Sequence, residues 1–290
     1  MTCGPYDRAR ALIDGEVKPE GIDLEIYVNA SPGRQTKIDG KEFDAAEFYT
    51  ATYIADLHYK TLGYTAIPIF VKRMFRHSYI YMNKRAGIRS PADLNGKRIG
   101  VRAYTQTTGC WVRGFLSEDY GVDLSTLRIV TFEDPHLAEY RDPPNVERAP
   151  EGKTLKQMLI DGEIDAAILG DVAEEGPIKH LIPDHEAAGR DWARRHGGVP
   201  INHLAVMRQS IVKERPDVVR EVYRVLKESR SAATGIASGA DDPLRFGIGA
   251  IRQSLEQINA YAVAQKLIPR AFSADELFAD AARILGADGA

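Results

Sequence analysis

The sequence contains few of the features that would identify a secreted, membrane or nucleic-acid-binding protein. Its 290 residues include only two cysteines, Cys3 and Cys110, so a disulfide framework is not expected and a reducing compartment is favoured. No run of about 18 apolar residues is present, which argues against a membrane-spanning helix. The chain opens Met-Thr-Cys-Gly-Pro, with neither a charged start nor an apolar stretch, and this predicts no secretory signal.

The overall charge is also close to balanced. Lys and Arg total 38 against 41 Asp and Glu, so the net charge of −3 provides no basic field that would recruit nucleic acid or an anionic membrane. These absences predict a cytoplasmic, soluble protein that binds neither nucleic acid nor membrane.

Familiar catalytic fingerprints are missing as well. Gly-x-Ser-x-Gly, Walker and dinucleotide-binding patterns do not occur, which counts against triad hydrolases, P-loop enzymes and dinucleotide enzymes. The seven histidines lack the close spacing of zinc ligands; the pair His136 and Glu139 stands three residues apart, in a stretch rich in proline, glutamate and arginine over 133–152. We therefore expect neither a metal nor a cofactor.

Apolar periodicity predicts an α/β fold, because short strands alternate with helices and such alternation is typical of largely parallel sheets. Strands are expected over 22–28, 43–47, 66–71, 78–82, 99–101, 127–132 and 164–169. Helices are expected near residues 9–12, from about 53, after 108, over 155–160, and from Pro216 onwards, including 244–267. The run 201–207 is apolar and precedes the helical part of the chain.

The densest cluster of charge lies in Phe70–His77, where Lys72, Arg73, Arg76 and His77 stand among aromatic residues. An arginine matches a carboxylate with two parallel hydrogen bonds, and a phenylalanine offers its face to a flat ring, so this segment suits a small aromatic acid. A solvated charged edge explains the same residues.

Three further places carry candidate ligand groups. Tyr104, Thr107 and Thr108 stand between a strand and a helix start, where free N–H groups attract anions, although simple capping by threonine explains them too. Arg8 is either a carboxylate clamp or the partner of a nearby aspartate, and Glu47 ends a strand where ligand groups of α/β sheets lie.

Several segments, taken together and in order, resemble the 4,5-dihydroxyphthalate decarboxylase family. They are Tyr6-Asp7-Arg8, Phe43-Asp44 to Glu47, Ile67-Pro68 leading to Phe75-Arg76-His77, the block from Ser90 to Val101, and the closing Leu267-Ile268-Pro269-Arg270. The block from Ser90 to Val101 is also similar to many type II periplasmic solute-binding proteins, whereas Tyr-Asp-Arg and Phe-Arg-His narrow the match to the decarboxylases. The family carries a short apolar strand before Tyr-Asp-Arg, where this chain has five residues.

The resemblance implies a type II periplasmic-binding-protein-like fold: two α/β lobes with a ligand cleft between them, joined by two crossing strands. One lobe is expected to comprise 1–82 plus 206–290 and the other 83–205, with 78–82 and 203–207 as the hinge strands. The cleft is expected to collect the substrate-binding residues Tyr6, Arg8, Arg73, Arg76, Tyr104, Thr107, Thr108 and Asp171, together with the catalytic residues Glu47, His77 and His203.

The implied activity is the cofactor-independent, non-oxidative decarboxylation of a hydroxylated aromatic acid, such as 4,5-dihydroxyphthalate to protocatechuate and carbon dioxide. His77 or His203 is expected to protonate the ring carbon, and Glu47 or the other histidine to meet the phenol. The alternatives are a solute-binding protein for a small organic acid or a thiamine-precursor-like ligand, and a synthase that uses the same fold. The expected partner is the small aromatic carboxylic acid, with a homo-oligomer left open.

Overall fold

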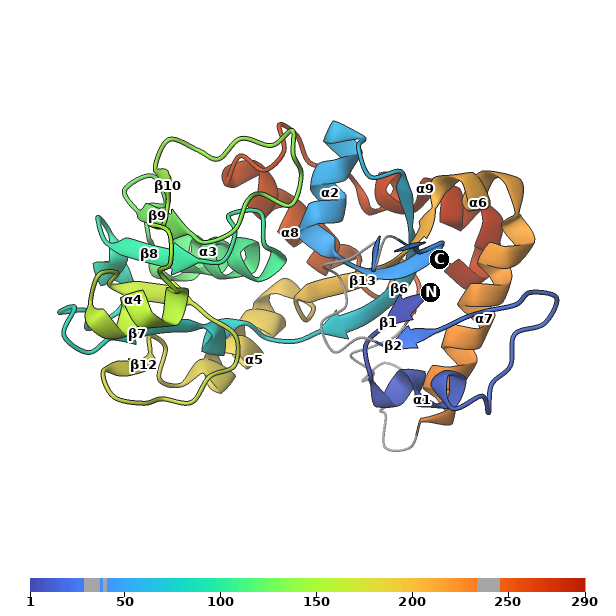
Figure 1. Cartoon of the computed structure of the whole chain (residues 1–290), viewed down its shortest axis with the longest axis horizontal. Coiled ribbons are helices and arrows are strands. Elements are labelled where there is room, and N and C mark those ends of the chain that lie inside the picture. The colour runs from blue at the N-terminus through green and yellow to red at the C-terminus, as the bar shows by residue number, and fades with distance from the viewer. Residues whose placement is uncertain (29–36, 39–40, 234–245, 290) are drawn as a thin grey trace.

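The computed structural model describes residues 1–28, 37–38, 41–233 and 246–289, and Figure 1 shows two lobes lying side by side along the long axis of the molecule. Each lobe is built around one sheet, with helices packed against it. The helical start expected at Leu244 lies outside the described residues.

The first sheet has five strands in the order β2-β1-β5-β13-β6. They span Tyr27–Val28 (β2), Thr2–Cys3 (β1), Ala45–Tyr49 (β5), Ile201–Arg208 (β13) and Tyr64–Arg73 (β6). β1 pairs in parallel with β2 and β5, whereas β13 runs antiparallel to both β5 and β6. A two-stranded hairpin, Lys37–Ile38 (β3) and Lys41–Glu42 (β4), stands apart from this sheet.

The second sheet has six strands in the order β10-β9-β8-β11-β7-β12. They span Val146–Arg148 (β10), Arg128–Thr131 (β9), Arg98–Val101 (β8), Ala166–Ile168 (β11), Ile80–Asn83 (β7) and Ile178–His180 (β12). Here β7 is antiparallel to both of its neighbours, and the other pairs are parallel. In both sheets, therefore, the antiparallel strand is the one that the chain enters after crossing from the other lobe.

The two crossings run close together. The chain leaves β6 at Arg73 and enters β7 at Ile80, and it returns from α5 into β13 at Ile201. The backbone N–H of Met74 donates to the carbonyl of Pro200 at 3.1 Å, which joins the two crossing segments. The α/β class, with two lobes and two crossings as expected of a type II periplasmic-binding-protein-like fold, is thus confirmed.

Nine α-helices occur in the described part of the chain: α1 Asp7–Ile13, α2 Thr50–Tyr59, α3 Thr107–Tyr120, α4 Leu155–Asp161, α5 His185–His196, α6 Gln209–Glu214, α7 Pro216–Ala232, α8 Arg252–Ala264 and α9 Ala274–Leu285. Three short 3₁₀ turns, η1 His77–Tyr79, η2 Pro91–Leu94 and η4 Gly286–Gly289, complete the order. As expected at Ser90, η2 begins with a capping box in which Ser90 and Asp93 satisfy each other's backbone N–H groups.

The apolar core is continuous between the lobes. One cluster of buried side chains extends from Phe48 and Leu204 in the first sheet to Trp111 on α3 and Tyr261 on α8. α8 follows the first lobe's helices in sequence but packs on α3, where the absent side chain of Gly114 makes room for the Tyr261 ring. With the lobes divided between residues 82 and 83 and between residues 205 and 206, α8 is therefore a helix that contacts both lobes.

Two expected elements differ from the structure for identifiable reasons. The alternating run 22–28 forms a ladder only at Tyr27–Val28, because Ile22, Leu24 and Ile26 pack against the core beside α7 without pairing their backbone. The stretch over 133–152 contains a short strand, β10, which adds to the edge of the second sheet.

Candidate active site

A buried carboxylate, Glu47 on β5, is the centre of the most unusual polar cluster in the described residues. β5 is buried along its whole length, and Glu47 is only 2% exposed. A buried carboxylate needs hydrogen-bond donors. The backbone N–H of Gly4 donates to Glu47 at 3.1 Å and the hydroxyl of Tyr6 donates at 2.7 Å, and Nδ1 of His203 also contacts Glu47.

His203 on β13 is the chemical counterpart of Glu47. Its Nδ1 contacts Glu47 Oε1. With a carboxylate as the acceptor, the neutral ring would carry its proton on Nδ1 and leave Nε2 as the basic position. Burial lowers the pKa of His203, while the bond to Glu47 acts in the opposite direction. The arrangement is that of a histidine whose tautomer and orientation are held by a carboxylate, as in general acid–base catalysis.

The segment between β1 and α1 supplies the other two contacts to Glu47. A Cβ at position 4 would lie 2.5 Å from the Tyr6 ring, so glycine there allows the ring to fold back and its hydroxyl to reach Glu47. Burial, reinforced by Glu47, raises the pKa of Tyr6 far above its usual range, and the phenol stays a donor. Tyr6 was expected to bind substrate; its hydroxyl instead orients the carboxylate.

Three cations surround this pair. The Arg8 guanidinium stacks on the Tyr6 ring at 3.9 Å from its centre, and the Arg76 guanidinium lies 4.5 Å from the centre of the Tyr79 ring. The charges that act on Lys72 are those of Arg76, Glu47 and Arg8. Tyr6, Arg8, Glu47, Lys72, Arg76 and His203 are called the Glu47 group below.

Burial disfavours the charged form of all three side chains. It lowers the pKa of Arg8 and of Lys72, and it lowers that of Arg76 to about 10. Arg76 is 2% exposed, yet its Nε and Nη2 have no hydrogen-bond partner among the described residues, and neither does Nε of Arg8. Buried guanidinium nitrogens without a hydrogen-bond partner are costly, and Arg76 and Arg8 contain such nitrogens next to Glu47 and His203.

An irregularity in the first sheet brings these residues together. His203 pairs with Tyr49 of β5 on one side and with Lys72 of β6 on the other, so the three side chains stand in one row. From the pair His203–Lys72 to the pair Ala205–Ile67, the chain runs through three more residues along β6 than along β13. Bulges of this kind re-aim side chains near active sites, and this one determines which part of Phe70–His77 faces His203.

Tyr49 connects the Glu47 group to the second lobe. Its ring makes an edge-type contact with the ring of His203, with the ring centres 5.1 Å apart, and stacks on the ring of His136, also with the centres 5.1 Å apart. His136 Nδ1 lies 2.9 Å from Thr52 Oγ1, and Arg102 donates to the Tyr49 hydroxyl at 3.4 Å. The stretch over 133–152, which the sequence left without an assigned role, therefore reaches the first lobe beside the candidate site.

In the segment Tyr104–Thr108, which was predicted to bind an anion, the side chains of Tyr104, Thr107 and Thr108 form hydrogen bonds to other residues of the protein. Thr107 Oγ1 accepts the N–H of Ala51 at 3.0 Å, and the Thr108 hydroxyl donates to Asn202 at 3.2 Å. The Tyr104 hydroxyl donates to the carbonyl of Gln265 at 3.0 Å, and its ring is covered by Arg113. These residues attach α3 to the first lobe and to α8, and Tyr104 in particular is not brought to the Glu47 group.

His77 also lies apart from the Glu47 group, although it follows Arg76 directly. It is fully buried on η1 and stacks on Phe115 of α3 at 4.1 Å, and no described residue makes a hydrogen bond to either of its nitrogens. Burial lowers its pKa to about 4, and the charges that reach it are those of Asp119, Arg195 and His185. Its neighbours differ from those of the Glu47 group, and its expected catalytic role stays a prediction.

The two remaining residues predicted to bind substrate, Arg73 and Asp171, lie in different parts of the structure. Arg73 ends β6 opposite Ile201 and is half-buried beside the first crossing. Asp171 is exposed after β11 in the second lobe, where its charge acts on Tyr81. The sequence did not single out Gly4, Tyr49 or Lys72; only Lys72 carried a signal, as one of the cations in Phe70–His77.

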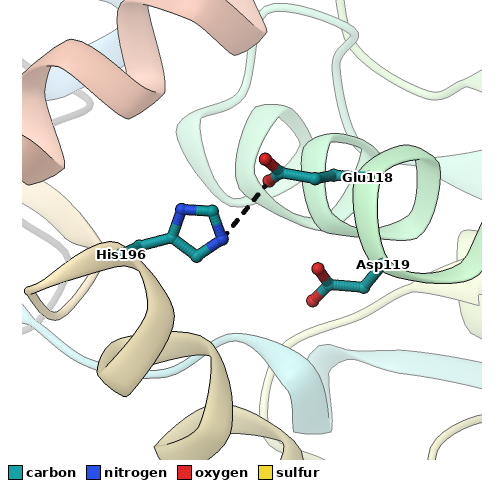
Figure 2. A group of neighbouring side chains, drawn as sticks. All are labelled: Glu118, Asp119 and His196. Carbon is teal, nitrogen blue, oxygen red and sulfur yellow. Dashed lines mark ion pairs between the residues drawn. The ribbon is translucent and has the colours of Figure 1, made fainter.

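A second cluster of candidate ligands lies at the end of α3, where α5 approaches it (Figure 2). Glu118, Asp119 and His196 place ligand atoms within 4.8 Å of one another. Their oxygens are already used: Asp119 receives two hydrogen bonds from Arg195 at 2.9 Å each, and Glu118 accepts from Tyr261. The cluster joins α3, α5 and α8 through side-chain pairs, and both oxygens of Asp119 are occupied by the Arg195 guanidinium.

Two surface cavities, of about 550 and 880 Å³, open beside α7 in the first lobe. Neither is lined by a residue of the Glu47 group or by any other residue expected to bind substrate. No helix in the part of the chain that the structure describes is both long and apolar enough to cross a membrane.

Comparisons with known proteins agree with these observations. No protein-family model matches the chain. It is 35% identical over 248 residues to a 4,5-dihydroxyphthalate decarboxylase of Comamonas testosteroni, covering 80% of this chain and 74% of that protein. It is 36% identical over 209 residues to a 4,5-dihydroxyphthalate decarboxylase of Pseudomonas putida, covering 67% and 80% respectively.

Among solved structures, the chain is similar to the periplasmic aliphatic sulphonate binding protein SsuA from Escherichia coli, with a TM-score of 0.47, 12% identity and coverage of 95% of this chain and 73% of that one. It is also similar to the desulfurization enzyme DSZB, with a TM-score of 0.44, 14% identity and 98% coverage of both chains.

Proposed function

The chain belongs to the 4,5-dihydroxyphthalate decarboxylase family, and on that premise we propose that it converts 4,5-dihydroxyphthalate to protocatechuate and carbon dioxide without oxidation. The observation that supports this most directly is the pair Glu47–His203, a carboxylate-held histidine among three cations. A general acid beside an anion-binding cluster is what the decarboxylation of an aromatic dianion requires.

The chemistry follows from the substrate. A hydroxyl para to the leaving carboxylate pushes electron density onto the ring carbon that bears it, and an acid delivers a proton to that carbon. The new C–H bond forms before the C–C bond breaks, and the pair from the C–C bond returns to the ring as carbon dioxide leaves. The scheme uses no cofactor.

We assign the proton to Nε2 of His203, because Nδ1 is engaged by Glu47. Glu47 acts as a positioning residue: it fixes the ring and stabilises the imidazolium, and it does not meet the phenol. Tyr6 and the Gly4 N–H hold Glu47 in turn.

Arg76, Arg8 and Lys72 receive the carboxylates of the substrate in this proposal. Two carboxylates on neighbouring ring carbons provide the anions that the unpartnered guanidinium atoms of Arg76 and Arg8 lack. Movement of the lobes toward each other would exclude water and favour release of neutral carbon dioxide. The cleft between the lobes, a cytoplasmic location and a homo-oligomeric state stay predictions.

The test incubates purified protein with 4,5-dihydroxyphthalate and follows protocatechuate and carbon dioxide, with and without a chelator. Equal release of both products in the two conditions is expected. Tight, reversible binding of the acid without release would refute the decarboxylase and favour a solute-binding protein. Loss of activity with the chelator would refute the cofactor-independent scheme.

A further inference from the structure

The proposed reaction needs a protonated His203, whereas its surroundings favour the neutral ring. The charged and titratable side chains on the elements packed around it are Glu47 and Tyr49 on β5, Lys72 and Arg73 on β6, Arg76 after β6, and Tyr6 and Arg8 at the start of α1. Cations outnumber carboxylates in this set.

The effects on His203 can be ordered. Burial lowers its pKa, the hydrogen bond and the charge of Glu47 raise it, and Lys72 and Arg76 lower it again. Lys72 is the cross-strand partner of His203, so its charge acts from directly beside the ring. No described residue hydrogen-bonds or ion-pairs with Lys72, and the charges that act on it are those of Arg76, Glu47 and Arg8.

Arg76 adds an independent observation. It is almost completely buried, and two of its nitrogens have no hydrogen-bond partner in the described part of the chain. A buried, unpaired guanidinium is stabilised when an anion binds next to it. Such an anion would offset two of the charges that lower the pKa of His203, a pKa that burial lowers most.

We propose that Lys72 and Arg76 control the protonation of His203, and that an aromatic dianion bound beside them makes His203 take up one proton from solvent at Nε2. This inference rests on the proposed function for the position of the ligand. The proton enters from water, Nδ1 keeps its hydrogen bond to Glu47, and the ring becomes the imidazolium that the reaction consumes. Substrate binding then prepares the acid, and the free protein keeps its histidine neutral.

The physical basis is linkage between a charge and a proton. Removing a like charge next to a titratable base raises the pKa of that base, and the difference appears as proton uptake on binding. The effect is greatest at a pH between the values of the free and the bound protein. Lys72 thus acts through His203 and is not itself the acid.

The experiment measures binding of phthalate by titration calorimetry near pH 7.5, in two buffers that differ in ionisation enthalpy. Phthalate is a dianion at this pH, and it lacks the hydroxyl that the decarboxylation needs, so only binding is observed. We expect the full-length protein to take up close to one proton per bound phthalate. His203→Gln is expected to bind phthalate with no uptake.

Lys72→Met provides the second variant. Without the ammonium, His203 is already partly protonated in the free protein, so proton uptake per bound phthalate should fall to less than half and its maximum should move to higher pH. His58→Gln and Lys213→Met are matched controls at exposed positions outside the group, and both should keep the uptake of the unchanged protein.

Several results would overturn the inference. They are the absence of phthalate binding, binding without uptake in the unchanged protein, uptake that survives His203→Gln, and uptake unaffected by Lys72→Met. Failure of the proposed function is a separate result: proton uptake with no carbon dioxide from 4,5-dihydroxyphthalate would refute the decarboxylation and leave the linkage intact.

Discussion

Replacing the buried carboxylate by its neutral amide, Glu47→Gln, separates the structural role of Glu47 from its chemical role. Oε1 accepts from Tyr6 and His203, and Oε2 accepts from the N–H of Gly4. A glutamine amide has one oxygen and one NH₂ group. The oxygen can keep the first two donors as neutral bonds, but the NH₂ then faces the Gly4 N–H and leaves that donor unsatisfied.

The expected cost in stability follows from these bonds. An orphaned buried donor costs about 1–3 kcal/mol, and a bond that changes from charged to neutral loses about 1 kcal/mol, while the desolvation of a carboxylate is recovered. We expect a net loss of about 2–4 kcal/mol in the free energy of unfolding, seen as a fall of roughly 4–8 °C in Tm.

The expected cost in activity is larger. Without the negative charge, the imidazolium of His203 is no longer stabilised, so kcat/KM should fall by about 10²–10⁴, equivalent to about 3–5 kcal/mol of transition-state stabilisation. Protocatechuate release is measured well below the Tm of the variant. Glu147→Gln is the matched control, because Glu147 is exposed on β10 and pairs only with Arg98 at 2.7 Å, so both readouts should be unchanged. A folded Glu47→Gln protein with kcat/KM within tenfold of the original would refute the assignment.

Three further predictions concern single side chains. His203→Gln should lower kcat by at least about 10² with little change in Tm, because only the proton donor is removed; kinetics and thermal unfolding check this. The pKa of His77 is lowered to about 4, so the unfolded chain takes up the proton before the folded protein does as the pH falls. The free energy of unfolding should therefore decrease by about 3 kcal/mol between about pH 6.5 and 4, which urea unfolding measures. The His77→Phe variant should lack the His77 contribution to this decrease and keep its activity. Gly114→Ala puts a methyl 2.0 Å from the Tyr261 ring and should cost about 1–3 kcal/mol, measured by denaturation, whereas Gly170→Ala meets open space and should cost nothing measurable.

The fold could be predicted largely from local patterns. The apolar runs 66–71 and 164–169 indicated strands correctly, and the described residues 66–69 and 166–168 within them are buried on both faces. The run 22–28 was over-predicted as a strand, since alternation reports that one side is buried and not that the backbone forms a ladder.

The site could be predicted only in part. Glu47 and His203 were identified as candidates, but their contact joins residues 156 positions apart and depends on the register of β5 with β13. His77 and Arg76 are neighbours in sequence that face different surroundings, because the η1 turn directs one to Phe115 and the other to Tyr79. Lys72 was present in the charged segment, yet its place beside His203 follows from a bulge in β6 that no local pattern reveals.

The residues of the Glu47 group come from the first sheet, from the turns at its ends or from the start of α1, and His136 and Arg102 of the second lobe approach them at Tyr49. This separation has an evolutionary consequence. Under the proposed function, substitutions on the 133–152 stretch, which reaches Tyr49 through His136, are expected to alter substrate acceptance more than the contact between His203 and Glu47. Descendants of one ancestral protein could therefore diversify in substrate by drift on one lobe, while purifying selection maintained the proton donor on the other.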